Sequence, residues 1–105
     1  MKLATEQRDG VAVVAVKGRL DVSSSPDFIE AMQAAEKQPT VLDMSGLEYL
    51  SSAGLRALHL AKKALPQLAV FGFNDFCSEI YEVSGFASIV PVYASLDDAL
   101  AAVQA

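Results

Sequence analysis

An unbroken apolar run, VAVVAV, spans residues 11–16 and sets the architecture that this chain can form. A strand with one face in water alternates apolar and polar residues, so a continuous run indicates a strand that is covered on both faces and lies inside a sheet. Asp9 and Gly10 precede the run and supply the positive φ angles that a tight hairpin turn needs. The sequence therefore predicts an opening β-hairpin of residues 2–8 and 11–17, with helices packed on the sheet.

Strand and helix patterns alternate along the rest of the chain. The apolar spacing predicts three further strands over 40–44, 68–73 and 89–93, and four helices over 25–38, 52–64, about 75–84 and from 95 onward. Parallel strands need crossover connections of this kind, so the sheet should be largely parallel after the hairpin. The 105 residues suit one domain over 1–105, with an α/β fold of five mixed strands and four α-helices.

The predicted helices carry capping residues and apolar stripes. Ser25 and Pro26 fit the cap and first turn of the first helix, Gly85 fits a C-cap, and Ser95 with Asp98 fits a capping box. The apolar residues that we expect to face the sheet are Phe28, Ile29, Met32 and Ala35 in the first helix, Leu55, Leu58 and Leu65 in the second, Phe76, Ile80 and Val83 in the third, and Leu96, Ala99, Leu100 and Val103 in the last.

Charge and composition restrict the function classes. The net charge is −5, and lysine and arginine cluster nowhere outside residues 56–63, which argues against nucleic acid as a partner. No apolar run is long enough to cross a membrane and the N-terminus lacks a signal-peptide core, so we expect a cytoplasmic protein without membrane contact. The single histidine, His59, and the single cysteine, Cys77, offer no metal-ligand spacing. We therefore expect no metal, no disulfide and no cofactor.

Two adjacent serines stand where a predicted strand gives way to a helix. Ser51 fits the N-cap and Ser52 the first turn, where unpaired backbone N–H groups and the helix macrodipole favour a negative charge. A phosphoryl group on Ser52 would be favoured there, and Arg56, four residues on, could reach it. His59 and Lys63 continue the same cationic stripe. A simpler interpretation stays open, in which the serines cap the helix and the cations form a solvated face.

A serine at such a junction can also be a nucleophile, as in a small hydrolase with Ser52 attacking and His59 acting as base. His59 lies on the same helix, about 10 Å further along its axis, which is too far for a direct hydrogen bond. The Gly-x-Ser-x-Gly nucleophile elbow is missing as well. The sequence therefore favours a binding module over an enzyme.

Polar residues also follow the second predicted strand. Asp21, Ser23 and Ser24 stand at its carboxyl end, and Ser51 and Ser52 stand between a later strand and its helix. In open α/β sheets, ligands and partners bind at the carboxyl ends of the strands, so these side chains should share one surface. The alternative is that Asp21 and the serines only end the strand and cap the next helix.

Three sequence motifs follow one another along the chain. The longest is VLDMSGLEYLSSAGLRAL over residues 41–58, and GRLD over 18–21 and VSGF over 83–86 flank it. In this order and spacing the chain resembles the STAS domains of bacterial anti-sigma factor antagonists. The signature residues of the long motif are Asp43, Ser45, Tyr49-Leu50, Ser51, Ser52, Ala53 and Gly54-Leu55. Two of these depart from the usual pattern, because Ser51 stands where an acid is usual and Ala53 replaces a second hydroxyl residue.

The resemblance implies how such a protein would act. Ser52, two residues before Gly54, matches the serine that a partner kinase phosphorylates in this family, with Ser51 as the runner-up. The partners implied are an anti-sigma factor serine/threonine kinase of the ATPase type and a serine phosphatase, and the chain itself would be a monomer or weak dimer without enzymatic activity. The alternative is a constitutive STAS interaction scaffold in a signalling or membrane-associated complex, in which the serine is never phosphorylated. The residues expected to contact the partner around the switch are Asp21, Ser23, Ser51, Ala53, Gly54, Arg56 and His59.

Overall fold

One mixed sheet of six strands organises the computed structural model, which describes residues 1–104. The strands are β1 (Lys2–Arg8), β2 (Val11–Leu20), β3 (Thr40–Asp43), β4 (Leu47–Leu50), β5 (Leu68–Phe71) and β6 (Val92–Tyr93). Their order is β1-β2-β3-β5-β6, and β4 pairs with β2 off this path. The β1–β2 pair is antiparallel and the other described pairs are parallel, as the sequence predicted.

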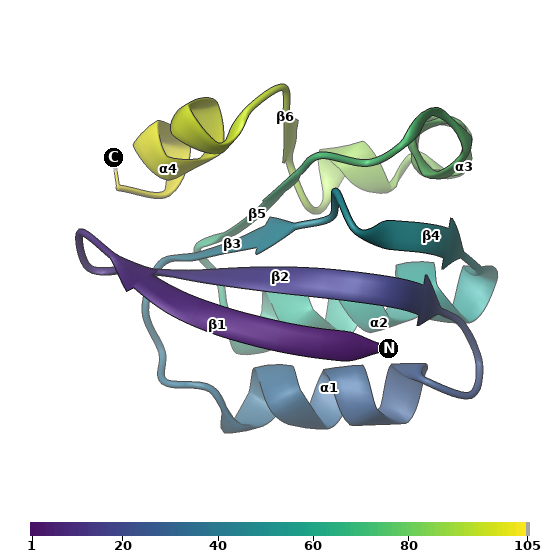
Figure 1. Ribbon diagram of the computed structural model, residues 1–105, viewed down its shortest axis with the longest axis horizontal. Helices are drawn as coiled ribbons and strands as arrows, with labels where there is room; N and C mark the ends of the chain where they lie inside the picture. Colours follow the sequence, from purple (N-terminus) through teal and green to yellow (C-terminus); the bar gives the residue numbers. More distant parts are fainter. Residues whose placement is uncertain (105) are drawn as a thin grey trace.

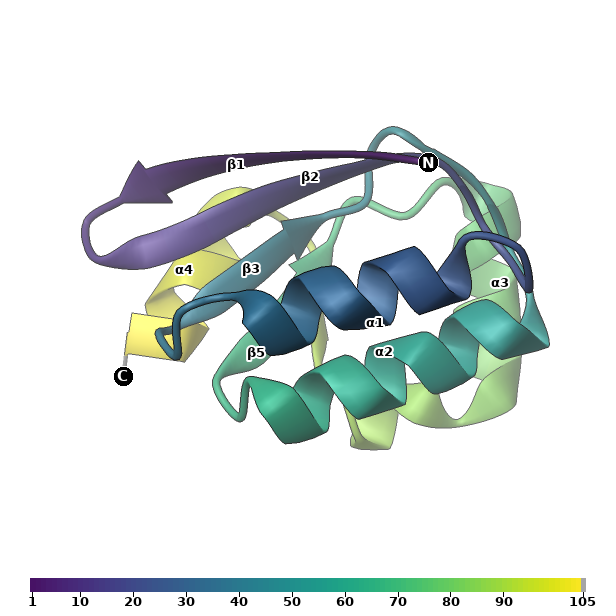
Figure 2. The same cartoon turned by 90° about the horizontal axis from the view of Figure 1, so that it is seen from below.

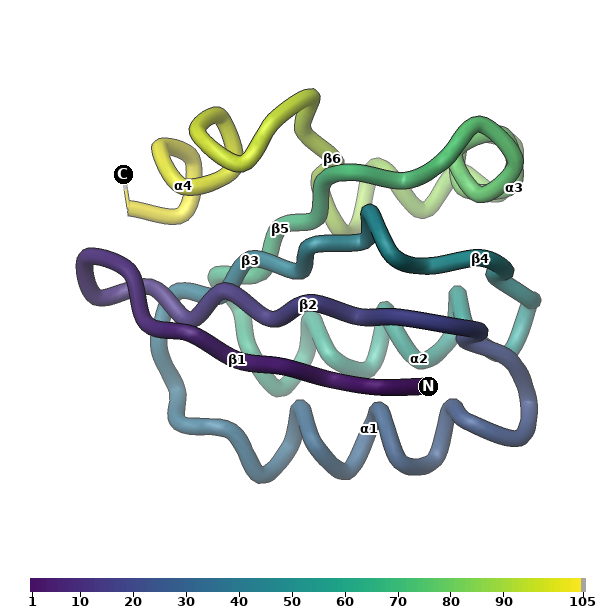
Figure 3. The backbone as a smooth tube through the Cα atoms, viewed as in Figure 1, coloured from purple at the N-terminus to yellow at the C-terminus, as the bar shows by residue number. Residues whose placement is uncertain are grey.

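Four α-helices lie within residues 1–104: α1 (Ser25–Ala34), α2 (Ser52–Ala64), α3 (Asp75–Ser84) and α4 (Leu96–Gln104). α1 and α2 pack side by side on one face of the sheet, and α4 lies over the opposite face (Figure 1, Figure 2). α3 lies beside β4, at the end of the molecule where β2 and β4 terminate (Figure 3). No helix in this part of the chain is both long and apolar enough to span a bilayer.

The opening hairpin forms as predicted, and its second strand is longer than predicted. Asp9 and Gly10 have φ angles of 53° and 81°, which suit the turn that joins two twisted antiparallel strands. β2 continues to Leu20 and changes partner along its length. Its first half pairs with β3, and its last three residues, from Gly18 to Leu20, pair with β4 across a register irregularity.

β2 is covered on both faces, as its unbroken apolar run predicted. Val14 and Val16 belong to the larger core, under α1 and α2, whereas Val11 and Val13 belong to the smaller core, under α4. Burying a valine or leucine side chain completely stabilises a fold by about 1.5–3 kcal/mol. The central strand is therefore packed on both faces, and this packing also fixes the positions of the loops at its ends.

The sequence did not predict β4. With this strand the sheet has six strands, whereas five were predicted. β4 is only four residues long, and it lies inside the segment between β3 and α2 that carried no strand prediction. A turn redirects the chain into it, because Asp43 accepts hydrogen bonds from the backbone N–H and the hydroxyl of Ser45, at 2.9 and 2.7 Å. The backbone N–H of Leu47 then donates to the carbonyl of Met44 and closes the turn.

Of the three residues predicted on the apolar stripe of α3, Ile80 is partly buried against the larger core, but the other two do not face the sheet. Cys77 and Tyr81 are buried, whereas Phe76 is 53% exposed and Val83 is 83% exposed. The cause is Asn74, which caps the helix by accepting from the N–H of Cys77 and anchors it by donating to the carbonyl of Leu47 in β4. This anchor fixes the rotation of α3, so Phe76 and Val83 point away from the core.

The start of α1 also differs from the prediction. Ser24 occupies the N-cap position and Ser25 is already helical, but neither hydroxyl caps the helix. The hydroxyl of Ser25 donates to the carbonyl of Asp21, and that of Ser24 donates to the carbonyl of Arg19. The helix ends at Ala34, before the predicted limit of 38. Ala35, which was expected to face the sheet, is therefore exposed.

Near the C-terminus the caps were predicted correctly and the strand was predicted too long. Gly85 ends α3 with a φ of 78°, and the hydroxyl of Ser95 accepts from the N–H of Asp98 at the start of α4. The predicted strand over 89–93 is reduced to two residues, because a 3-10 turn at Phe86–Ser88 takes up the chain after α3. β5 likewise ends at Phe71, before the predicted limit of 73.

Candidate functional site

The paired ends of β2 and β4 bring two polar loops together. Leu20 lies opposite Leu50 in the parallel register, and the N–H of Ser51 donates to the carbonyl of Leu20 at 3.1 Å. Asp21 and Ser51 therefore leave the sheet at the same place, as the sequence topology predicted. Figure 1 shows both loops at the end of the molecule where α2 begins.

Ser51 is the N-cap of α2, as predicted from the sequence. Its backbone is extended, with φ −101° and ψ 175°, and its hydroxyl accepts from the N–H of Gly54 at 3.2 Å. The same hydroxyl lies 3.4 Å from the carbonyl of Leu20, to which it donates. The half-buried Ser51 is therefore engaged in holding the first turn of the helix to the end of β2.

Ser52 is the first helical residue, and its side chain is exposed. No side-chain hydrogen bond involves Ser52 within residues 1–104, and no acidic residue occupies the first turn of α2. The N-terminal N–H groups of a helix carry partial positive charge, and an anion at this end is stabilised by them. An exposed, unengaged hydroxyl thus stands where a negative group is favoured.

Asp21 organises the neighbouring loop through several hydrogen bonds. Its carboxylate accepts from the hydroxyl and the N–H of Ser23, at 2.8 and 3.1 Å, and from the N–H of Ser24 at 3.2 Å, while Arg19 Nε lies 3.3 Å away. These partners, the Ser23 hydroxyl above all, lower the pKa of Asp21 to about 2. The carboxylate is therefore ionised throughout the physiological range.

Gly54 is required by the close approach of α2 to β2. A Cβ atom at this position would lie 2.4 Å from the carbonyl oxygen of Leu20 and 2.9 Å from a methyl carbon of Leu50. The Leu50 methyl belongs to a side chain and can rotate, but the Leu20 carbonyl is backbone and cannot retreat without moving β2. Any side chain here would push the first turn of the helix away, and Ser52 with it.

The other predicted residues divide between the surface and the interior. Arg56 is exposed one turn after Ser52, whereas Ala53 is half-buried and Gly54 is buried. His59 is half-buried, and the centroid of its ring lies 6.2 Å from that of Phe86. Its side chain therefore packs partly against the protein and is not fully exposed on the cationic stripe. We define the Ser52 surface as the neighbouring exposed and half-buried positions Asp21, Ser23, Ser51, Ser52 and Arg56.

Two residues beside this surface were not identified as site residues from the sequence. The guanidinium of Arg19 lies 4.3 Å from the ring centroid of Tyr49, which stands opposite it in the β2–β4 register. Arg19 thereby joins Tyr49 to Asp21. Part of the signal was present in the sequence, because Arg19 and Asp21 are only two residues apart at the end of β2, but only the pairing of β2 with β4 shows that Tyr49 is their neighbour.

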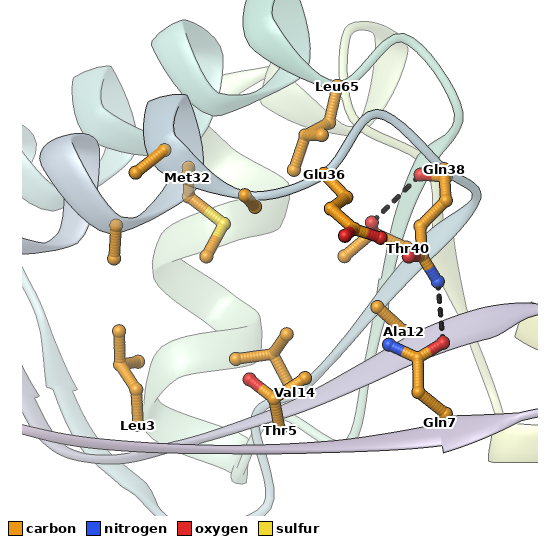
Figure 4. Close-up of a pocket in the computed structure, with 13 residues that line it drawn as sticks. Leu3, Thr5, Gln7, Ala12, Val14, Met32, Glu36, Gln38, Thr40 and Leu65 are labelled. Carbon is orange, nitrogen blue, oxygen red and sulfur yellow. Dashed lines mark hydrogen bonds between the residues drawn. The ribbon is translucent and has the colours of Figure 1, made fainter.

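A cavity of about 380 Å³ lies between β1 and α1, away from the Ser52 surface. Figure 4 shows Leu3 and Thr5 of β1 on the side opposite Met32 of α1, and Gln7 of β1 accepting a hydrogen bond from Gln38. Leu65 lines the cavity just after the last residue of α2, whereas Ser52 begins that helix, so the two lie about 20 Å apart. The cavity and the exposed serine are separate features.

The sequence matches the model of the STAS domain over residues 2–99. The chain belongs to the STAS family. BtrV of Bordetella bronchiseptica, which is named as an anti-sigma factor antagonist, is 36% identical to this STAS domain over 97% of the chain and 94% of BtrV. The crystal structure of an anti-sigma factor antagonist from Mycobacterium paratuberculosis superimposes with a TM-score of 0.89, at 32% identity, over 99% of this chain and 94% of the other.

SpoIIAA of Bacillus shares the fold of this STAS domain at much lower identity. Its unphosphorylated form gives a TM-score of 0.73 at 13% identity, over 98% of this chain and 96% of SpoIIAA. Its phosphorylated form gives 0.64 at 14% identity, over 95% and 97%. The likeness to SpoIIAA establishes the common fold, and the STAS family rests on the match to the domain model and on the likeness to BtrV.

The hydrogen bonds of the two serines predict different effects on stability. Ser51→Ala removes the N-cap and should lower the free energy of unfolding by about 1 kcal/mol. Ser52→Ala removes an exposed hydroxyl without a partner and should change it by less than about 0.5 kcal/mol. Urea denaturation of both variants measures the difference. A larger loss for Ser52→Ala than for Ser51→Ala would contradict the assignment of the cap.

The hydrogen bonds to Asp21 predict its titration. Its folded pKa, about 2, lies below the ordinary value of 3.8, so the charged form stabilises the fold above pH 3.8 and this contribution is lost as the pH falls through about 2. NMR titration of the Asp21 carboxyl carbon should give a midpoint near 2, and Ser23→Ala should raise it. A midpoint at 3.8 in both proteins would show that the loop hydrogen bonds do not persist in solution.

Proposed function

We propose that this STAS domain is an anti-sigma factor antagonist that acts by partner switching in the cytoplasm. In its unmodified form it binds an anti-sigma factor through the Ser52 surface, and the anti-sigma factor then releases its other target. The anti-sigma factor, as a serine/threonine kinase of the ATPase type, transfers the γ-phosphoryl group of ATP to the Ser52 hydroxyl, and the complex separates. A serine phosphatase hydrolyses the phosphoserine and restores the binding form.

The observation that carries this proposal is the exposed Ser52 hydroxyl at the start of α2. A kinase needs a hydroxyl that it can reach and deprotonate, and a helix N-terminus tolerates the phosphate that results. Ser51 is the weaker candidate, because its half-buried hydroxyl is already bonded to Gly54 and Leu20. These contacts favour Ser52 over Ser51 as the acceptor.

The relatives support the same role. BtrV and the mycobacterial protein are both named as anti-sigma factor antagonists, and each exceeds 30% identity over nearly the whole chain. SpoIIAA has been solved in an unphosphorylated and a phosphorylated form on this fold. A switch that changes surface charge while leaving the fold in place is consistent with these structures.

The electrostatics of the Ser52 surface explain how a phosphoryl group would end binding. Phosphorylation adds a charge of about −1.5 to −2. Asp21 already places an ionised carboxylate on the neighbouring loop, because its pKa is about 2. An interface fitted to a neutral serine would then meet two adjacent negative groups, and a coupling of about 3 kcal/mol, or roughly 150-fold in affinity, is sufficient for a switch.

The kinase would contribute the catalytic groups in this scheme. ATP, its magnesium ion and the base that accepts the hydroxyl proton belong to the partner, and this STAS domain contributes the acceptor oxygen and the docking surface. The alternative is a constitutive scaffold, in which Ser52 is never modified and the same surface holds a permanent partner. The two functions differ in whether charge at Ser52 controls binding.

Retention of partners from a lysate of the native cells tests this difference. The baits are the wild-type protein, Ser52→Ala, Ser52→Glu and, as a matched control, Ser88→Glu, which places the same charge on an exposed serine after α3. Wild type, Ser52→Ala and Ser88→Glu should retain a kinase of the ATPase type. Ser52→Glu should lose it, with an affinity at least about tenfold lower in a titration with the purified kinase.

Two outcomes would contradict the proposal. Retention of the same proteins by Ser52→Glu and the wild type would indicate a constitutive scaffold. Loss of the kinase with Ser88→Glu as well would show that added negative charge, and not its position, controls binding.

Phosphorylation by the retained kinase is a second test of the acceptor residue. Incubation of this kinase with ATP should phosphorylate the wild type but not Ser52→Ala.

A further inference from the structure

The outward face of α3 exposes an apolar stripe. Phe76 and Val83 are 53% and 83% exposed, and the partly buried Ile80 lies between them. These positions follow the i, i+4, i+7 spacing that places side chains along one side of a helix. A shallow groove of about 420 Å³ is formed here by Phe76, Glu79, Ile80, Val83 and Ser84.

The fold does not need the two exposed residues of this stripe, Phe76 and Val83. α3 is held to the domain by its opposite side, where Cys77 and Tyr81 are buried and Asn74 bonds to the carbonyl of Leu47. The hydroxyl of Tyr81 also donates to the carbonyl of Val90 and fixes the segment after the helix. Exposed apolar side chains that contribute so little to the core lower solubility, and they are typical of a surface that a partner covers.

Negative charge borders the stripe. Asp75, Glu79 and Glu82 are exposed on α3, and the helix contains no lysine or arginine. None of the three carboxylates forms an ion pair within residues 1–104, where the salt bridge found joins Arg19 to Asp21. A partner that covers the stripe must therefore bring apolar side chains together with positive charges.

The stripe is continuous with the Ser52 surface. The Phe76 ring stacks on Tyr49, with centroids 5.8 Å apart and an interplanar angle of 25°. Tyr49 contacts Arg19, and Arg19 pairs with Asp21. In Figure 1 and Figure 3, α3 lies beside β4 at the end of the molecule where α2 begins. A single partner can therefore contact α3 and Ser52 together.

We propose that the outward face of α3 is a docking site for an amphipathic helix with flanking lysines or arginines, carried by the regulator that binds the Ser52 surface. The identification of that regulator rests on the proposed function, whereas the chemistry of the docking site does not. The stripe from Phe76 to Val83 spans about 10 Å of helix, so two to three turns of a partner helix, with apolar residues at matching spacing, would cover it.

The first test uses a synthetic amphipathic helix of leucine and lysine, about four turns long, and a second peptide with glutamate in place of lysine. The amide signals of the ¹⁵N-labelled full chain report where each binds. The lysine peptide should shift signals of residues 75–84 and of Tyr49 at concentrations below about 1 mM, and the glutamate peptide should shift none. Shifts confined to other elements, or no shifts, would overturn the proposal.

Surface variants separate apolar docking from charge attraction alone. Val83→Asp removes apolar area but keeps the acidic border, and Glu79→Lys/Glu82→Lys reverses the border but keeps the stripe. Both should weaken the lysine peptide at least about tenfold. Glu30→Lys/Glu36→Lys, which makes the same change of net charge beside α1, should leave binding within about twofold. Equal binding by Val83→Asp and the wild type would overturn the apolar part of the site.

Titration with the purified regulator distinguishes the two proposals. If Ser52→Glu and the α3 variants both weaken binding, both proposals stand. If only Ser52→Glu weakens it, the switch stands and docking on α3 is wrong. If only the α3 variants weaken it, the docking site stands and the proposed switch fails. If neither does, both proposals are wrong for that regulator.

Discussion

The carbonyl of Leu20 is where the sheet and the candidate site are joined. It accepts the N–H of Ser51 at 3.1 Å and lies within reach of the Ser51 hydroxyl, and its approach to α2 leaves space only for a glycine at position 54. These contacts fix the first turn of α2 against the end of β2. Because Leu20 is buried in the larger core, the exposed Ser52 hydroxyl is positioned by the interior of the domain.

The same strand end also organises the charges around the serine. Asp21 follows Leu20 directly and binds Ser23, Ser24 and Arg19 through its carboxylate. Arg19 extends the network across β4 to Tyr49, and Tyr49 stacks on Phe76 of α3. One exposed chain of contacts thus links the loop after β2 to the helix beside β4. A regulator bound to this end of the domain would meet a neutral serine, an ionised carboxylate and an apolar stripe on one continuous surface.

Much of this arrangement was predictable because its signals are local. The Asp9-Gly10 turn, the cap at Ser51 and the end of α3 at Gly85 depend on neighbouring residues, and the structure confirms all three. Topology then predicted that Asp21 and the serine pair would meet. Evidence for individual contacts of a partner cannot come from these local signals, so the roles of Ser52 and Arg56 stay proposals.

The features that the sequence did not predict depend on contacts between distant segments. β4 has four residues and exists because β2 extends beyond β3 and offers it a partner. The rotation of α3 depends on the hydrogen bond from Asn74 to Leu47, which the helical periodicity of Phe76 and Val83 does not contain. The periodicity correctly indicated a helix, but the long-range hydrogen bond from Asn74 to Leu47 determines which side of that helix is buried.

A switch at Ser52 requires that this residue carry a reversible phosphoryl group in the cell. The most direct test is mass spectrometry of the protein isolated from its native cells, first intact and then as fragments that separate Ser51 from Ser52. We expect a fraction of the molecules to carry one phosphoryl group, located on Ser52, and we expect this fraction to change with growth conditions. Protein that is unmodified under every condition, or phosphorylated only at another residue, would contradict this expectation.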